Sequence, residues 1–208
     1  MKIAVIDSGI CDGHPHVGVL AGAVHFTPDG PGGDPVDRLG HGTAVAGAIR
    51  EKVPAADLFA VKVFDRRLTA SISALLRALA WCREHRMEVV NLSLGTANPE
   101  HRASLEEAVR GNGIVVSAAG MLPGSLPGVV GVDADASCPR DRFRCRSGVF
   151  LASPYPRSIP GVPPGRNLNG VSFAVANMTG FVAQALESSG REALWAALAA
   201  GAEDPDGL

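Results

Sequence analysis

The chain has 208 residues, of which 46% are hydrophobic and 19% are charged, and its formal net charge is −2. This length suits one domain with a substantial core, and the composition is that of a globular protein rather than a disordered one. The small net charge predicts no general attraction to nucleic acid or to anionic lipid, and no apolar run approaches the roughly 18 residues of a membrane-spanning helix.

Short apolar runs alternate with segments of helical periodicity along the chain. The apolar runs, rich in Val and Ile, predict strands over 2–6, 58–64, 88–94, 113–119, 128–132 and 148–152. Helices are predicted over 43–52, 69–86, 99–112 and 172–186. Such alternation predicts one α/β domain, a mostly parallel, twisted sheet with helices on both faces. Loops are predicted at the Pro- and Gly-rich segments 27–35 and 155–170.

Polar residues stand where predicted strands end or predicted helices begin. Asp7 directly follows the first strand, Ser93 ends the strand 88–94, and His41 and Ser172 open helices. In α/β sheets, functional groups gather at the carboxyl ends of the strands. Hydrolysis by serine needs a hydroxyl, a histidine and a carboxylate, which this set supplies. Each residue also has a structural interpretation, in which Ser172 caps a helix, Asp7 forms a turn and His41 starts a helix.

The residues around Asp7, His41 and Ser172 are more specific than the three alone. The segments VIDSGI (5–10), GHGTAVAGAI (40–49) and GVSFAVANMTG (170–180) resemble, in this order, the three signature segments of the subtilisin-like serine proteases. The resemblance covers about residues 1–186 and includes LFAVKVF (58–64), EVVNLSLG (88–95), SAAG (117–120) and LPGSLPGVVGVDA (122–134). It implies a subtilisin-like peptidase domain over 1–201, followed by a short acidic tail, 202–208.

The resemblance also assigns roles to individual residues. Ser172 is the expected nucleophile, His41 the general base and then acid, and Asp7 the carboxylate that orients the histidine. The substrate-binding strand is expected at Ser93, Leu94 and Gly95, where backbone groups would pair with an extended peptide. Gly120 is also expected at the substrate, and Gly42 and Gly120 are interpreted as positions of close backbone approach. Asn91 is expected to be structural.

Met121 departs from the family pattern. It stands where the family has the asparagine that completes the oxyanion hole, and a loop deletion there is expected to remove a wall of the specificity pocket as well. A thioether cannot donate a hydrogen bond. In subtilisin, losing that donor costs about 2.7–4 kcal/mol of transition-state stabilisation. The Ser172 backbone N–H remains, and the candidate replacement donors are a backbone N–H, a water, or the side chains of Asn167, Asn169 and Asn177.

Other polar clusters have ordinary explanations beside functional ones. No calcium site is inferred from the resemblance, and Asp29, Asp34 and Asp37 are interpreted as a solvated acidic loop rather than as metal ligands. Alternating arginines would share one side of an extended segment, as a solvated or salt-bridged face or as a secondary site for an acidic precursor; these are Arg140, Arg142, Arg144 and Arg146. Cys82 is expected in the core. Cys138 and Cys145 are expected to be free thiols, with a disulfide or a metal as the alternative.

The sequence therefore predicts a compact serine endopeptidase that acts without a cofactor or metal. The expected partner is a peptide or protein substrate, with no nucleic acid and no membrane, and the altered pocket favours a narrow processing role such as leader removal from a precursor. The segment MKIAVIDSG becomes a strand at once and does not resemble a secretory signal, which predicts a cytoplasmic location. The alternatives are a peptide-binding module whose hydrolysis is weakened at Met121 and, less favoured, an esterase-like role.

Overall fold

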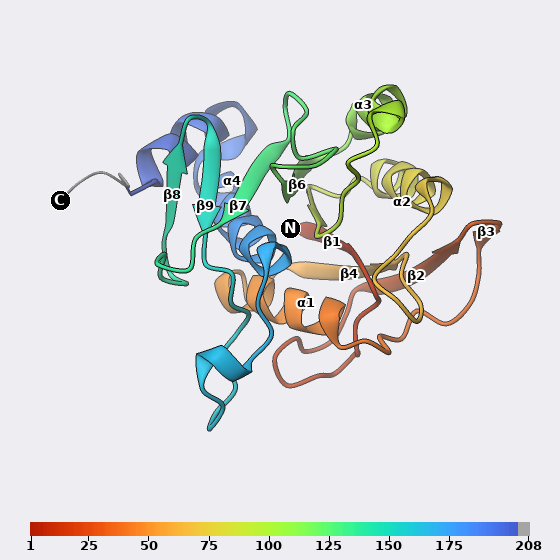
Figure 1. Cartoon of the computed structure of the whole chain (residues 1–208), viewed down its shortest axis with the longest axis horizontal. Coiled ribbons are helices and arrows are strands. Elements are labelled where there is room, and N and C mark those ends of the chain that lie inside the picture. Colours follow the sequence, from red (N-terminus) through yellow and green to blue (C-terminus); the bar gives the residue numbers. More distant parts are fainter. Residues whose placement is uncertain (204–208) are drawn as a thin grey trace.

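The computed structural model of the chain describes residues 1–203, which form one nine-stranded sheet with helices on both faces (Figure 1). The strand order is β3-β2-β4-β1-β5-β6-β7-β9-β8. The strands are β1 (Lys2–Asp7), β2 (Gly22–Thr27), β3 (Gly30–Pro31), β4 (Asp57–Lys62), β5 (Val89–Leu92), β6 (Ile114–Ala118), β7 (Val130–Ala134), β8 (Phe143–Arg146) and β9 (Val149–Ala152). Only the edge pairs β2–β3 and β8–β9 are antiparallel among these residues, so the predicted mostly parallel α/β sheet is confirmed.

Helices cover the two faces of the sheet in pairs. They are α1 (His41–Lys52), α2 (Ile72–Glu84), α3 (Arg102–Val109) and α4 (Val171–Gly201), with short 3-10 turns at Pro99–His101 and Pro164–Arg166. One core joins α1 and α4 to Ile3 and Val5, and the other joins α2 and α3 to Ala4 and Ile6. Because successive strand residues face opposite sides, a central strand covered on both faces must be apolar throughout, as the β1 sequence is.

The structure adds elements that the sequence patterns did not predict. β2 and β8 were not predicted, and β3 lies inside the predicted loop 27–35. α4 continues beyond the predicted end at residue 186 to Gly201, with a break at Gly190, where φ is 74°. α3 is shorter than the predicted helix 99–112, because its first residues form a 3-10 turn.

The C-terminal part of the chain returns to the sheet edge. The backbone N–H of Glu203 donates to the Phe143 carbonyl at 2.9 Å, so the first residues of the predicted tail 202–208 pack on β8. Residues 204–208 of that tail lie outside the described residues. All four cysteines are described, and all are free thiols, with Cys82 buried as predicted. Of the helices formed within residues 1–203, none has the length and apolarity needed to cross a membrane.

The carboxyl edge of the sheet brings the candidate residues together. β1 and β5 are neighbours in register, with Ile6 opposite Leu92. Asp7, which ends β1, and Ser93, which follows β5, therefore emerge at the same edge. α1 and α4 pack against each other on one face, and their first residues include His41 and Ser172.

Candidate active site

Asp7 and His41 form a buried pair at this edge. The His41 Nδ1 atom lies 2.7 Å from Asp7 Oδ1, and the side chains are 13% and 0% exposed, respectively. A carboxylate accepts only, so this contact places the imidazole proton on Nδ1 and leaves Nε2 to act as a base. The helix can approach β1 this closely because residue 42 is glycine: a Cβ there would lie 2.2 Å from the Gly9 carbonyl oxygen. The predicted close approach at Gly42 is therefore confirmed.

The environment raises the pKa of His41 above its ordinary value of 6.5. Burial of the imidazole opposes protonation, but the hydrogen bond to Asp7 and the negative charges of Asp7 and Asp37 outweigh it. Asp7 also accepts a hydrogen bond from the backbone N–H of Ser8 at 2.7 Å, which fixes the carboxylate. The pair is thus suited to hold a proton taken from a neighbouring group.

Asp37 is a positioning residue that sequence reasoning did not identify. Its carboxylate is buried and accepts hydrogen bonds from the Ser8 hydroxyl, the Thr43 hydroxyl and three backbone N–H groups, those of Leu39, Gly40 and Thr43. The Ser8 hydroxyl in turn accepts from the Gly42 N–H at 2.9 Å. Asp37 therefore ties the start of α1 to the end of β1. The N-cap of α1 is Gly40, and Asp37 lies three residues before it, so the capping signals of the sequence could not have identified it.

The expectation of a solvated acidic loop is therefore wrong at Asp37, which is 7% exposed. The expectation of a solvated loop agrees better with Asp29 and Asp34, because Asp29 is exposed and Asp34 pairs with the exposed Arg38 at 2.7 Å. Within residues 1–203, no three His, Cys, Asp or Glu side chains gather in an arrangement that would hold a metal ion.

Ser172 is the second residue of α4 and does not cap the helix. The N-cap is Gly170, which supplies no side-chain bond, so the capping interpretation of Ser172 is wrong. The Ser172 hydroxyl donates to the Ser93 carbonyl at 3.2 Å rather than to His41, and the Ser93 hydroxyl donates to the Ser172 carbonyl at 3.2 Å. The neighbouring Phe173 ring lies 5.3 Å from the His41 ring. Both candidate catalytic segments thus meet here, and the Ser172 hydroxyl is bonded to the Ser93 carbonyl.

Asn91 joins this serine pair to the body of α4. Its Nδ2 donates to the Ser93 hydroxyl at 2.9 Å, and its Oδ1 accepts from the Thr179 hydroxyl at 2.9 Å. Because Asn91 and Thr179 are fully buried, these contacts fix β5 relative to α4. The structural role expected for Asn91 agrees with this arrangement.

The segment expected to bind substrate lies half-buried beyond β5. Thr96 and Leu122 exchange two backbone hydrogen bonds, of 2.9 and 3.0 Å, so the chain pairs with itself immediately after Gly95. A Cβ at Gly95 would lie 2.8 Å from the Met121 Cβ. The close-approach explanation for Gly120 is wrong, because nothing lies within 4 Å of a Cβ placed there.

The candidate replacement donors for the oxyanion differ in whether their side-chain amides are already bonded within the protein. Asn177 is fully buried, and its Nδ2 already donates to the carbonyls of Ser153 and Tyr155, so its candidacy is wrong. Asn167 donates to the Arg157 carbonyl at 3.3 Å, and Asn169 is exposed. The first turn of α4 offers another source, since the opening N–H groups of a helix lack intrahelical acceptors.

Three of the alternating arginines pair with carboxylates of the chain itself. Arg140 contacts Glu51, Arg142 lies 2.7 Å from Glu203, and Arg144 lies 2.7 Å from Asp135. The salt-bridged alternative describes these three residues.

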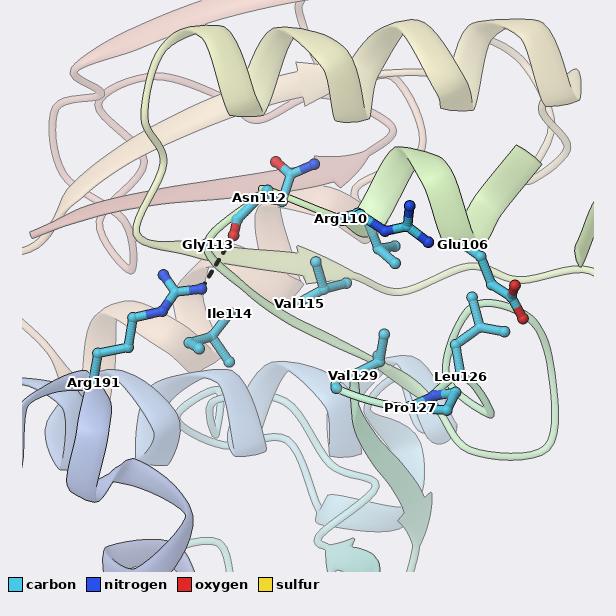
Figure 2. A pocket seen from close by; sticks show the side chains of 13 residues that line it. Glu106, Arg110, Asn112, Gly113, Ile114, Val115, Leu126, Pro127, Val129 and Arg191 are labelled. Atoms are coloured by element: carbon cyan, nitrogen blue, oxygen red, sulfur yellow. Dashed lines mark hydrogen bonds between the residues drawn. The ribbon is translucent and has the colours of Figure 1, made fainter. Parts of the chain in front are cut away.

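Two cavities differ in their relation to this edge. One, of about 500 Å³, is lined by Gly40 and Leu168 and therefore lies beside the segments that carry the candidate residues His41 and Ser172. The other, of about 400 Å³, lies at the amino ends of β6 and β7, the opposite edge of the sheet. Figure 2 shows this second cavity, where Arg191 donates to the Asn112 carbonyl. This second cavity therefore lies at the opposite edge of the sheet from the candidate residues Asp7, His41 and Ser172.

Comparisons with known proteins point to one family. Residues 1–134 match the peptidase S8 model, the subtilase family. The chain is 33% identical to subtilisin Savinase of Lederbergia lenta, over 88% of this chain and 75% of that protein. It is also 33% identical to M-protease of Shouchella clausii over 88% of this chain, and spans about half (53%) of that relative.

Solved structures agree with this similarity. A cold adapted subtilisin-like serine proteinase superposes with a TM-score of 0.69 at 21% identity, covering 90% of this chain and 76% of that one, which shows the fold. The prenylagaramide maturation protease PagA superposes with a TM-score of 0.62 at 25% identity, covering 89% and 74%.

Proposed function

Because the chain belongs to the subtilase family, we propose that it is a serine endopeptidase in which Ser172 is the nucleophile, His41 the base and Asp7 the orienting carboxylate. The observation that carries the proposal is the 2.7 Å contact between His41 and the fully buried Asp7, at the edge where α4 presents Ser172. A buried carboxylate on Nδ1 favours the tautomer that can accept a proton at Nε2.

The reaction follows from these groups. The Ser172 hydroxyl leaves the Ser93 carbonyl, gives its proton to His41 Nε2, and its oxygen bonds to the substrate carbonyl carbon. His41 then returns the proton to the departing amine as the C–N bond breaks, which leaves an acyl group on Ser172. Water repeats the sequence and releases the acid. The oxyanion would bind the Ser172 backbone N–H and a second donor other than Met121.

A fluorophosphonate labelling experiment tests this assignment. We expect intact mass to show one adduct on the wild type and none on Ser172→Ala, with labelling of His41→Ala strongly reduced because the hydroxyl then has no base. Labelling of Ser172→Ala equal to wild type would contradict the nucleophile assignment. A wild-type protein that binds peptides without labelling would support the alternative, a peptide-binding module.

We further propose a narrow processing role, such as leader removal from a precursor peptide. The similarity to the maturation protease PagA and the self-pairing of Thr96 with Leu122 support it, because the pairing limits the space next to the expected substrate strand. Incubation with a casein digest and with candidate precursors tests it. Broad cleavage of casein at rates equal to those of every precursor would contradict the narrow role.

An acidic precursor segment at Arg140, Arg142 and Arg144 would have to displace Glu51, Glu203 and Asp135, which disfavours that secondary site.

We also propose a cytoplasmic location, supported by the four free thiols, since reducing compartments keep cysteines unpaired. Fractionation of cells that produce the protein tests the location, and recovery from the medium would contradict it.

A further inference from the structure

The 500 Å³ cavity beside the catalytic segments has no part in the mechanism above. It is lined by the loop that follows β1, the first turn of α1 and the loop between β9 and α4. Gly40 directly precedes His41, and Leu168 lies four residues before Ser172. The cavity therefore lies next to the segments that carry the base and the nucleophile, although neither His41 nor Ser172 lines it.

The cavity lies on a different flank of the site from the expected substrate strand. No residue between 93 and 122 lines it. A peptide whose acyl part pairs with Ser93–Gly95 must continue past Ser172 on the leaving-amine side. The cavity is placed to receive that continuation.

The lining predicts the chemistry of the first leaving-side residues. Ile159 and Leu168 are 44% and 49% exposed, although large apolar side chains gain free energy when they leave water. Pro15, Pro156 and Ala44 add apolar surface around them. Exposed apolar groups gathered in one concavity mark a binding surface more often than a random part of the exterior. An apolar side chain fits here.

A second, more open concavity of about 410 Å³ continues from the first and shares Pro15, His16 and Arg157 with it. It adds Arg50. Arg157 donates to the His16 carbonyl, and Arg50 donates only to backbone carbonyls. Within residues 1–203, neither forms an ion pair with a carboxylate, in contrast to Arg140, Arg142 and Arg144. An acidic group on the ligand would supply the missing partner.

We propose that the two concavities form the leaving-group side of the substrate site and take an apolar residue followed by an acidic one. Leu168 and Ile159 determine the preference for the apolar residue, and Arg157 determines that for the acidic residue. This inference rests on the proposed endopeptidase function, because it needs an acyl group on Ser172 whose leaving side can be occupied.

Acyl transfer to dipeptide amides tests the inference separately from the function. An activated peptide ester acylates Ser172, and added amides compete with water for the acyl group. We expect leucyl-glutamine amide and glycyl-glutamate amide each to give about tenfold more transfer product, relative to hydrolysis, than glycyl-glutamine amide, the range that one apolar group or one ion pair supplies. Leu168→Ser should remove the preference for leucine over glycine, and Arg157→Gln the preference for glutamate over glutamine. Arg66→Gln, at a side chain 90% exposed and outside both concavities, is the matched control and should retain both preferences.

The outcomes separate the two claims. Ester hydrolysis with equal transfer to all amides would overturn the inference and leave the endopeptidase function standing. Preferences that survive in both Leu168→Ser and Arg157→Gln would also overturn it. Absence of both ester hydrolysis and fluorophosphonate labelling in the wild type would overturn the proposed function and, with it, the inference.

Discussion

The Asp7–His41 side of the site is held by charged and hydroxyl hydrogen bonds, whereas the Met121–Leu122 side is held by backbone pairing and apolar contact. On the first side, two buried carboxylates fix the start of α1. On the second, Leu122 pairs with Thr96, and Met121 packs against the same core as Phe173. Proton transfer depends on placement within fractions of an ångström, which rigid polar networks provide.

The contrast between these two sides indicates that substrate binding, rather than proton transfer, is the part of the activity in which this chain departs from the family. The groups that would move a proton are all present, and Asp7 and His41 are tightly fixed, whereas the Ser172 hydroxyl bonds to the Ser93 carbonyl. The position expected to bind the carbonyl oxygen carries a thioether, which cannot donate. We infer that the chain keeps the chemistry of acyl transfer and differs in how it holds the substrate.

Replacing Asp7 should have the largest effect. Asp7→Asn leaves the shape nearly unchanged but favours the wrong imidazole tautomer, and in a serine protease of another fold the equivalent change lowers kcat about 10⁴-fold. Steady-state hydrolysis of the best peptide substrate, with circular dichroism as the control for folding, measures this. A folded Asp7→Asn protein with kcat within tenfold of wild type would refute the role of Asp7 as the orienting carboxylate.

Removing the Asp37 carboxylate should come next. Asp37→Ala frees the start of α1 and leaves the hydroxyls of Ser8 and Thr43 without their acceptor, so we expect kcat to fall about 10²-fold through misplacement of His41. KM should change little, because Asp37 contacts no expected substrate group. Asp34→Ala is the matched control, since Asp34 pairs only at the surface. A large rise in KM with unchanged kcat would contradict a positioning role.

Lys52 is the last residue of α1 and contacts α4, the two helices whose first turns carry the candidate residues His41 and Ser172. Its ammonium donates to Asn177, and burial, with Arg140 nearby, lowers its pKa from 10.5 to about 8. The unfolded chain then binds more protons between pH 8 and 10.5, so the free energy of unfolding should rise with pH across that window, by at most about 3 kcal/mol. Denaturant titrations of wild type and Lys52→Met measure it. Equal slopes in the two proteins would exclude Lys52 as the source.

The pH dependence of kcat/KM tests the Asp7–His41 pair, and the expected effect is a shift of the pH midpoint. His41 must be neutral to accept a proton, and its pKa is raised, so activity should appear as pH rises through a midpoint above 6.5. A rate profile between pH 5 and 9 on a small neutral peptide locates the midpoint. A midpoint at or below 6.5 would show that Asp7 does not stabilise the imidazolium.

Met121→Asn should have the smallest effect on turnover. If the backbone matched the family, a new amide would raise kcat by up to ~10²-fold. Met121 instead packs against the core beside Gly95, so we expect kcat to stay within threefold and stability to fall by about 1 kcal/mol. A rise above tenfold would show that position 121 faces the oxyanion after all.

The sequence predicted six of the nine strands of the sheet, including the central ones, and it named the three candidate catalytic residues. Continuous Val- and Ile-rich runs identify central strands covered on both faces, and short motifs identified Asp7, His41 and Ser172. The strands β8 and β3, at the two edges of the sheet, were missed because they contain no continuous apolar run. β8 alternates Arg with Phe and Cys, and β3 has only two residues. Asp37 was misread because burial of a carboxylate depends on donors that only the folded chain assembles.

Mapping the acyl-enzyme during turnover tests the central claim most directly. An activated peptide ester is mixed with the protein, the reaction is quenched within milliseconds, and the peptides are analysed by mass. We predict the acyl group on the peptide that contains Ser172, at near one per chain in wild type, and more than a hundredfold slower acylation in His41→Ala. An acyl group on another residue, or hydrolysis by Ser172→Ala at the wild-type rate, would contradict the account.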